Sequence, residues 1–102
     1  MIKLPKKFLR GSIPPLITPF KKGRVDYDTY ATLVEHQIKN GSHGVLINGT
    51  TSEPAALTVE ERNRIADVAI ETASGRIPVV VATGSQNLQE TRILTDHAQN
   101  AG

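Results

Sequence analysis

The sequence predicts an α/β fold in which strands and helices alternate along the chain. Three short apolar runs, at residues 12–18, 44–48 and 77–82, have the length and composition of buried strands. Each run is followed by a segment whose apolar residues recur at helical spacing. Because each helix must return the chain to the same edge of the sheet, this order requires parallel strands.

The first run, residues 12–18, is a predicted strand that contains two prolines. Pro14 and Pro15 cannot donate to a β-ladder, but prolines are tolerated near the start of a strand. Pro19 and the KKGR run at 21–24 then predict a polar loop.

The first helix has clear signals at both ends. Asp26 is suited to be its N-cap, and Val25 can pack on Tyr30 as a hydrophobic staple. Apolar residues then follow helical spacing as far as Ile38, and the Asn-Gly pair at 40–41 ends the helix.

The second strand, residues 44–48, is apolar throughout, as expected for a strand covered on both faces. The helix that follows begins with a capping box, in which Thr58 is the cap and Glu61 reaches back. Gly75 closes this helix. Its predicted buried face consists of Ile65, Ala66, Val68, Ala69 and Ala73.

The third strand, residues 77–82, is predicted to be buried and to leave the sheet through 83–85. Asn87 and Glu90 can start the last helix. The inward face of that helix is predicted to include Leu88, Leu94 and Ala98.

Charge divides the chain into a basic arm and a domain. Residues 1–24 hold seven basic and no acidic groups, whereas the remainder holds five basic and ten acidic groups. We expect an arm at 1–10 and one domain at 11–102. No aromatic or arginine pattern supports nucleic-acid binding, no apolar run is long enough for a membrane span, and no secretory signal is visible, so we expect a cytoplasmic protein.

A polar turn, Gly49-Thr50-Thr51-Ser52-Glu53, follows the second predicted strand. In parallel α/β folds, ligands gather beyond the carboxyl ends of the strands. Gly49 allows close approach of the backbone, the two threonine hydroxyls can donate to an anion or relay a proton, and Glu53 is expected to tether the loop by accepting backbone amides. From spacing alone, a plain polar loop that caps the next helix is the somewhat favoured interpretation.

Three stretches, GSIPPLITPF, VDYDTYATLVEHQIKNGSHGVLINGTTSEPAALTVEER and GRIPVVVATGS, resemble the dihydrodipicolinate synthase / N-acetylneuraminate lyase family over residues 11–102. The resemblance implies that the chain forms the first three units of a (β/α)8 barrel. It also implies class I aldolase chemistry, in which a lysine forms a Schiff base with pyruvate and a tyrosine and a threonine move protons. No metal and no cofactor is implied.

Site residues follow from the resemblance at matching positions. Thr50 would be the proton relay, and Thr51, together with Thr50 and neighbouring amides, would bind the pyruvate carboxylate. Gly49 and Glu53 would support the loop. Ser52 departs from the glycine usual in the family, and we expect its side chain to narrow the turn or to impose ordinary backbone angles.

The remaining catalytic groups are expected beyond Gly102, because the family carries its Schiff-base lysine on the sixth strand and its tyrosine on the fifth. We therefore expect the 102 residues alone to be inactive. None of the lysines at 3, 6, 7, 21, 22 and 39 lies in an apolar context, Tyr27 and Tyr30 are expected to pack, and the three histidines share no metal-binding spacing.

The expected function is that of a synthase that condenses pyruvate with an aldehyde such as aspartate semialdehyde. The alternatives are a related 2-keto acid aldolase of the 2,4-dihydroxyhept-2-ene-1,7-dioate type, an N-acetylneuraminate lyase-like enzyme, or a small phosphate-binding domain. A further alternative is a non-catalytic remnant or the partner of a complementing barrel fragment. The family tends to form tetramers, so a longer chain would be expected to form a homo-oligomer.

Overall fold

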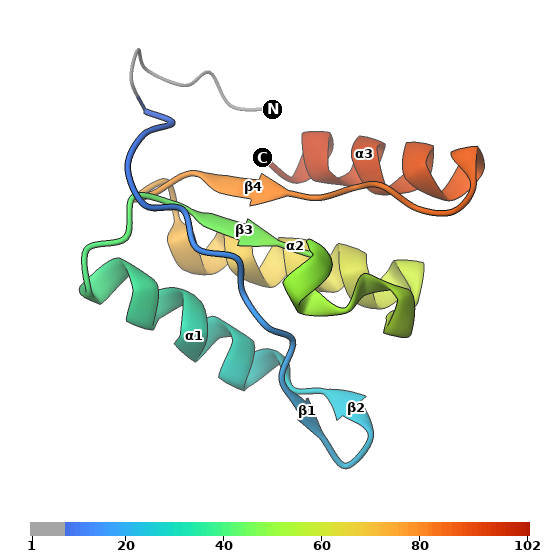
Figure 1. Ribbon diagram of the computed structural model, residues 1–102, viewed down its shortest axis with the longest axis horizontal. Helices are drawn as coiled ribbons and strands as arrows, with labels where there is room; N and C mark the ends of the chain where they lie inside the picture. The colour runs from blue at the N-terminus through green and yellow to red at the C-terminus, as the bar shows by residue number, and fades with distance from the viewer. Residues whose placement is uncertain (1–7) are drawn as a thin grey trace.

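The computed structural model describes residues 8–102, and the predicted basic arm at 1–10 lies mostly outside them. Helices and strands alternate in this part of the chain (Figure 1). The elements are β1 (Phe20–Lys21), β2 (Arg24–Val25), α1 (Tyr27–Lys39), β3 (Val45–Ile47), the 3-10 turns η1 (Thr50–Ser52) and η2 (Pro54–Ala56), α2 (Val59–Ala73), β4 (Val79–Val81) and α3 (Leu88–Ala101).

Parallel pairing confirms the predicted α/β class. In the β3–β4 pair, Val45 lies opposite Val79 and Ile47 opposite Val81. The segment 12–18 lies on the other side of β3 (Figure 1), where the Leu16 N–H donates to the Leu46 carbonyl at 2.9 Å.

The predicted strand at 12–18 is reduced to a single parallel bridge between Pro15 and Leu46. The carbonyl of Pro14 accepts from the Leu46 N–H at 3.0 Å, so Pro14 lies in the register that faces β3. Because proline has no N–H, the rung that Pro14 would donate is missing. The segment therefore runs beside β3 without completing a ladder.

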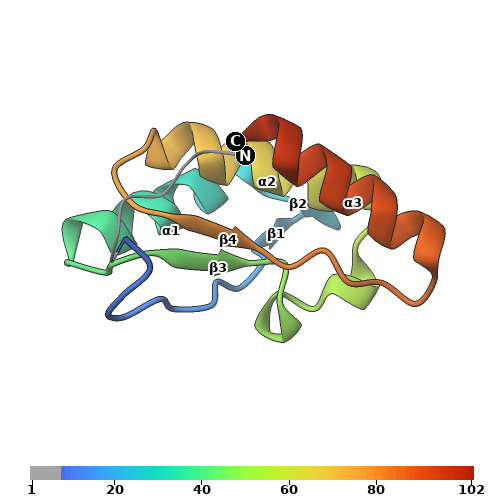
Figure 2. The same ribbon diagram turned by 90° about the horizontal axis from the view of Figure 1, so that it is seen from above.

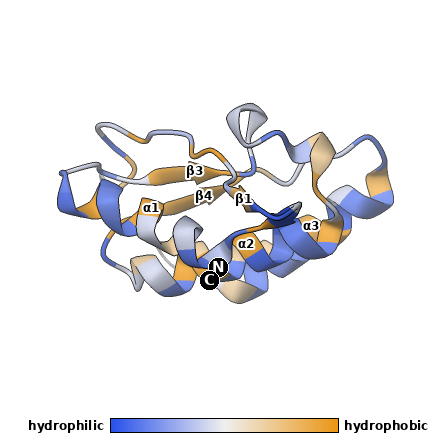
Figure 3. Cartoon of the chain, turned by 90° about the horizontal axis from the view of Figure 1, so that it is seen from below, coloured by the Kyte–Doolittle hydropathy of each residue, from blue (hydrophilic) through white to orange (hydrophobic). Residues whose placement is uncertain are grey.

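The helices cover one face of the sheet. Figure 2 shows α1, α2 and α3 on the same side of β3 and β4. Apolar residues concentrate on the strands and on helix stripes, as Figure 3 shows. The core on this side is one cluster of buried residues: Leu16, Val25, Tyr30, Val34, Val45, Ile47, Leu57, Ile65, Ala66 and Ala69.

The opposite face of the sheet is apolar but open. Register partners share a face, so Pro15, Leu46 and Val80 lie together there. Val80 is 36% exposed, and Ile17 is 57% exposed. The predictions that strand 44–48 is covered on both faces and that strand 77–82 is buried are therefore wrong for residues 8–102, because the helices in this part of the chain lie on one side only.

Helix starts agree with the sequence. Asp26 accepts from the Thr29 N–H, Thr58 and Glu61 form the capping box, and Asn87 accepts from the Glu90 N–H. At the other end of α2, Ser74 adopts a left-handed conformation directly before Gly75.

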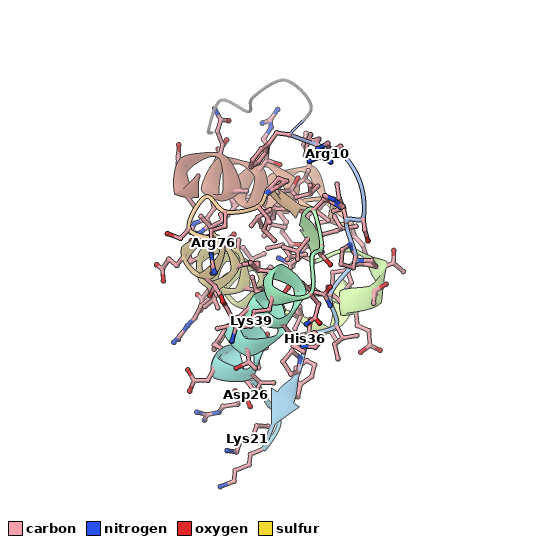
Figure 4. The ribbon with its side chains drawn as sticks, turned by 90° about the vertical axis from the view of Figure 1, so that its left-hand side faces the viewer. Arg10, Lys21, Asp26, His36, Lys39 and Arg76 are labelled. Atoms are coloured by element: carbon pink, nitrogen blue, oxygen red, sulfur yellow. The ribbon has the colours of Figure 1, made fainter. Side chains whose placement is uncertain are left out.

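Two local predictions are wrong. Leu88 is 64% exposed, because periodicity defines the side of a helix but not whether a neighbouring element reaches its first turn. The predicted polar loop at 19–24 is a small antiparallel hairpin, in which Lys22 and Gly23 both take positive φ as a tight hairpin turn requires. Figure 4 shows Lys21 at the end of this hairpin, away from the helices.

No helix within residues 8–102 has both the length and the apolar character needed to cross a membrane.

Candidate functional site

The turn at 49–53 leaves the sheet at the carboxyl end of β3. The exit of β4 lies at the same end, since the Ala82 N–H donates to the Ile47 carbonyl at 3.0 Å. The first segment also leaves there, because the Thr18 hydroxyl donates to the Ser52 carbonyl at 2.9 Å. Three neighbouring exits thus meet at the end of the sheet where parallel α/β folds bind ligands.

Thr50 and Thr51 are both exposed on this rim, and neither side chain enters the core. The turn closes through two bonds, from the Ser52 N–H to the Gly49 carbonyl and from the Glu53 N–H to the Thr50 carbonyl. Among the hydrogen bonds of residues 8–102, none uses the N–H groups or hydroxyls of the two threonines. Two hydroxyls and two amides therefore remain for a ligand.

Ser52 is the buried end of the turn, with 1% of its surface exposed. Its hydroxyl donates to the Leu16 carbonyl at 2.5 Å, in addition to the bond that its carbonyl accepts from Thr18. The residue keeps a negative φ, so ordinary backbone angles are present as expected. The sequence did not predict these hydrogen bonds, because a serine gives no local signal for a partner 36 residues away in the chain.

Asn48 is the buried beginning of the turn, with 2% exposure and a φ of 59°. Its side-chain Nδ2 donates to the Arg62 carbonyl at 3.0 Å, which attaches the end of β3 to α2. Its Oδ1 atom is buried without a partner among the described residues. Sequence reasoning assigned Asn48 only to the strand and missed this role.

Arg62 connects α2 to the exit of β4. It is 5% exposed, and its two terminal nitrogens donate to the Ala82 carbonyl at 3.0 Å and the Gly84 carbonyl at 2.9 Å. Burial lowers the pKa of the guanidinium, and the charge of Glu90 opposes that shift. A buried arginine that binds two carbonyls fixes the position of the loop that follows β4.

The two predicted supporting residues act differently from expectation. Glu53 has an exposed side chain that makes no capping hydrogen bond, so the predicted tether is wrong; the residue instead adopts a left-handed φ of 56° between η1 and η2. Gly49 has a φ of −79°, and a Cβ there would lie 3.5 Å from Leu46, an ordinary contact. Neither a positive φ nor crowding requires glycine at this position.

Other titratable candidates lie away from the turn. Lys21, Lys22 and Lys39 are exposed on the hairpin and at the end of α1, and the lysines at 3, 6 and 7 lie outside the described residues. Tyr30 is fully buried in the core, where desolvation raises the pKa of its hydroxyl well above the usual range.

The remaining aromatic and imidazole groups have structural contacts. Tyr27 packs against the core and lies under the Arg64 guanidinium at 4.3 Å. His97 pairs with Asp67 at 2.7 Å, and His43 accepts from the Ser12 N–H at 3.0 Å. No group of three metal-binding side chains exists in residues 8–102.

The threonines lie on an open rim rather than in a cleft. A hollow near them begins at Pro54 and is bounded by Arg62, Gly84 and Glu90, and neither Thr50 nor Thr51 lines it. A ligand on the turn would therefore be covered from one side only by the described residues.

The described residues form a one-sided, partial α/β layer, and the hydroxyl and amide groups of the turn lie at the rim where parallel α/β folds bind ligands. The chain belongs to the dihydrodipicolinate synthetase family, whose sequence model matches residues 8–102.

Similar proteins agree with this family. The 4-hydroxy-tetrahydrodipicolinate synthase of Thermus thermophilus is 50% identical over 93 residues, which are 91% of this chain and 31% of that protein. The crystal structure of dihydrodipicolinate synthase from Aquifex aeolicus superposes with a TM-score of 0.88 at 42% identity, covering 92% of this chain and 32% of that one.

A third similar protein is the chloride-inhibited dihydrodipicolinate synthase from Acinetobacter baumannii, whose structure is a complex with pyruvate. It has a TM-score of 0.86 at 35% identity, and the match covers 92% of this chain and 33% of that one. The chain thus spans about a third of the length of the relatives that it matches.

Proposed function

We propose that residues 11–102 form the first three βα units of a (β/α)8 barrel, and that they contribute the pyruvate-binding turn of a class I lyase or synthase. The reaction type is that of 4-hydroxy-tetrahydrodipicolinate synthase, which would condense pyruvate with an aldehyde such as aspartate semialdehyde. The observation that carries this proposal is the exposed Thr50–Thr51 pair at the carboxyl end of β3, between the buried residues Asn48 and Ser52.

Thr51 and the neighbouring amides bind the carboxylate of pyruvate in this proposal. Hydroxyl and N–H donors that are fixed before binding orient the keto carbon, and orientation removes much of the entropy cost of the encounter. The Thr50 hydroxyl, which both donates and accepts, relays a proton during Schiff-base chemistry. Because the described lysines lie on the hairpin and at the end of α1, the reactive amine comes from another part of the barrel.

The partner that completes the site is the remaining set of βα units. Two features of residues 8–102 support this. The apolar face with Ile17, Leu46 and Val80 is open, and one edge of β4 has no strand partner among these residues. A closed barrel covers such a face with side chains from its other strands and leaves no edge. We propose that these units belong to the same polypeptide or to a complementing fragment, and that the whole barrel assembles into a homotetramer.

The test is pyruvate binding by the 102-residue chain and by the same chain mixed with the C-terminal two thirds of the Thermus relative. Thr51→Val should weaken binding by about tenfold or more, because it removes a donor to a charged group. Thr50→Val should leave binding within about threefold but slow turnover of the mixture by about a hundredfold. Binding is followed by NMR shifts and turnover by product formation.

Thr32→Val is the matched control, since Thr32 is an exposed threonine on α1 far from the turn. Borohydride should trap a pyruvate adduct in the mixture but not on the 102-residue chain. The proposal fails if Thr51→Val binds pyruvate as tightly as Thr32→Val does, or if the unmixed chain itself forms the adduct.

A further inference from the structure

Two buried side chains attach the turn at 49–53 to the neighbouring segment. The Ser52 hydroxyl donates to the Leu16 carbonyl, and the Thr18 hydroxyl donates to the Ser52 carbonyl. Leu16 is itself bonded to β3 through its N–H. The exit of β3 and the end of the segment 12–18 are therefore joined at Ser52, while Thr50 and Thr51 stay exposed.

We infer that Ser52 is a positioning residue that holds Thr50 and Thr51 in their binding arrangement before a ligand arrives. Its N–H closes the turn on the Gly49 carbonyl, so the position of Ser52 determines the path of the two residues before it. At the other end, Asn48 is held by its bond to the Arg62 carbonyl. Only residues 49–51 span the two buried anchors.

A short segment between fixed ends has few conformations, so little entropy is lost when it binds a ligand. Alanine or glycine at position 52 would leave the Leu16 carbonyl without its hydroxyl partner and would remove one of the two bonds that attach this end of the turn to the segment 12–18. Serine stands here where the family resemblance implies glycine, so this attachment is a property of this chain. The effect on pyruvate rests on the proposed function; the effect on the turn does not.

The first experiment measures amide hydrogen exchange in the 102-residue chain without ligand. In Ser52→Ala and Ser52→Gly, the amides of residues 52 and 53 should exchange about tenfold faster or more. Local opening of the turn no longer has to break the buried hydrogen bond to the Leu16 carbonyl. Ser42→Ala is the control. The Ser42 hydroxyl likewise donates a hydrogen bond, to the Gln37 side chain at 2.7 Å, but Ser42 lies before β3, at the opposite end of that strand from the turn. Its exchange at the turn should match that of the unmodified chain.

A second pair of variants keeps position 52 intact. Thr18→Val removes the hydroxyl that donates to the Ser52 carbonyl, and Thr18→Ser keeps it. Exchange at Glu53 should rise in Thr18→Val and return to the unmodified rate in Thr18→Ser. This rescue separates loss of the hydroxyl from general loosening, and it decides the inference even if the Ser52 variants do not fold.

Pyruvate titrations of the same variants provide the third measurement. Ser52→Ala should bind pyruvate about fivefold more weakly than Ser42→Ala does. Amide hydrogen exchange within α2 should be equal in the two variants. If the unmodified chain gives no pyruvate response, alone or with the complementing fragment, the proposed function fails while the exchange data still decide the role of Ser52. The inference is overturned if turn exchange is the same in Thr18→Val and Thr18→Ser, or if foldable Ser52 variants exchange like Ser42→Ala.

Discussion

The two faces of the sheet carry the same kind of side chain but have opposite surroundings. On the helix-covered face, Val45 and Ile47 have no exposed surface. On the other face, Ile17 is 57% exposed and Val80 is 36% exposed. Register pairing places Leu46 and Val80 together on that open face, so the difference is systematic and not limited to one residue.

This difference shows that the helices of the βα units cover only one face of their own sheet, so burial of the other face requires additional elements. Helices α1 and α2 follow the strands in sequence and cover one face with their own apolar stripes. Strands that are apolar on both faces belong to sheets covered on both sides. The open face therefore has a sequence suited to a covered interior, and the threonine rim beside it likewise lacks the second wall of a cleft.

The largest expected effect comes from shortening one valine on each face. Val45→Ala should lower the free energy of unfolding by about 2–3 kcal/mol, because it removes two methyl groups from a fully buried site and leaves a cavity. Val80→Ala should cost less than about 1 kcal/mol, because the side chain is already partly in water. Urea unfolding followed by circular dichroism measures both.

These two variants are matched in residue type, and their strands are paired. Equal losses would mean that the open face is covered in solution, by a second copy or by a different arrangement of the chain. Adding the complementing barrel fragment should raise the cost of Val80→Ala toward that of Val45→Ala, since Val80 would then be buried.

The next effect concerns Arg62, which links α2 on the covered side to the exit of β4. Arg62→Met should lower the free energy of unfolding by about 2 kcal/mol, because the Ala82 and Gly84 carbonyls lose a charged donor. Removal of the buried guanidinium offsets part of that loss, because its desolvation cost disappears. Amide exchange at 82–85 should increase more than exchange within β3. Arg64→Met, an exposed change on the same helix, is the control, and an equal loss in both variants would contradict a specific role for Arg62.

The sequence predicts the parts of this fold that depend on local signals. Asp26, the Thr58–Glu61 capping box and Asn87 all act on amides two or three residues away, so their spacing along the chain is sufficient. The turn at 49–53 was recognised because it directly follows an apolar run, and its place at the carboxyl end of β3 agrees with the prediction.

The anchors of the site depend on residues distant in sequence, and these were missed. Ser52 binds a carbonyl 36 residues earlier, and Arg62 binds carbonyls 20 and 22 residues later. A carboxylate such as that of Glu53 looks like a plausible tether in sequence, but only the fold determines whether an amide lies within its reach. The prediction that Val80 is buried was wrong because no element among residues 8–102 covers its face of the sheet, which the apolar sequence of the strand does not reveal.

The smallest effect concerns an ion pair between two elements on the helix-covered side of the sheet. Arg76, after α2, contacts Glu35 on α1 with two hydrogen bonds, at 3.0 and 2.6 Å. Figure 4 labels Arg76, which lies beside α2. The hydrogen bond from Arg76 holds the pKa of Glu35 below its usual value, although partial desolvation opposes the shift.

A lowered pKa in the folded state makes stability depend on pH in one direction. Above the unfolded glutamate pKa of about 4.3, the contribution of Glu35 is fully present, and it is lost as the pH falls through the lower folded pKa. Glu35→Gln should therefore flatten the fall in stability below about pH 4.3, measured by urea unfolding at a series of pH values. Glu71→Gln is the control variant, because Glu71 is an exposed glutamate on α2 that forms no ion pair with another residue among 8–102. If Glu35→Gln gives the same pH curve as this control, the contact between Arg76 and Glu35 does not form in solution.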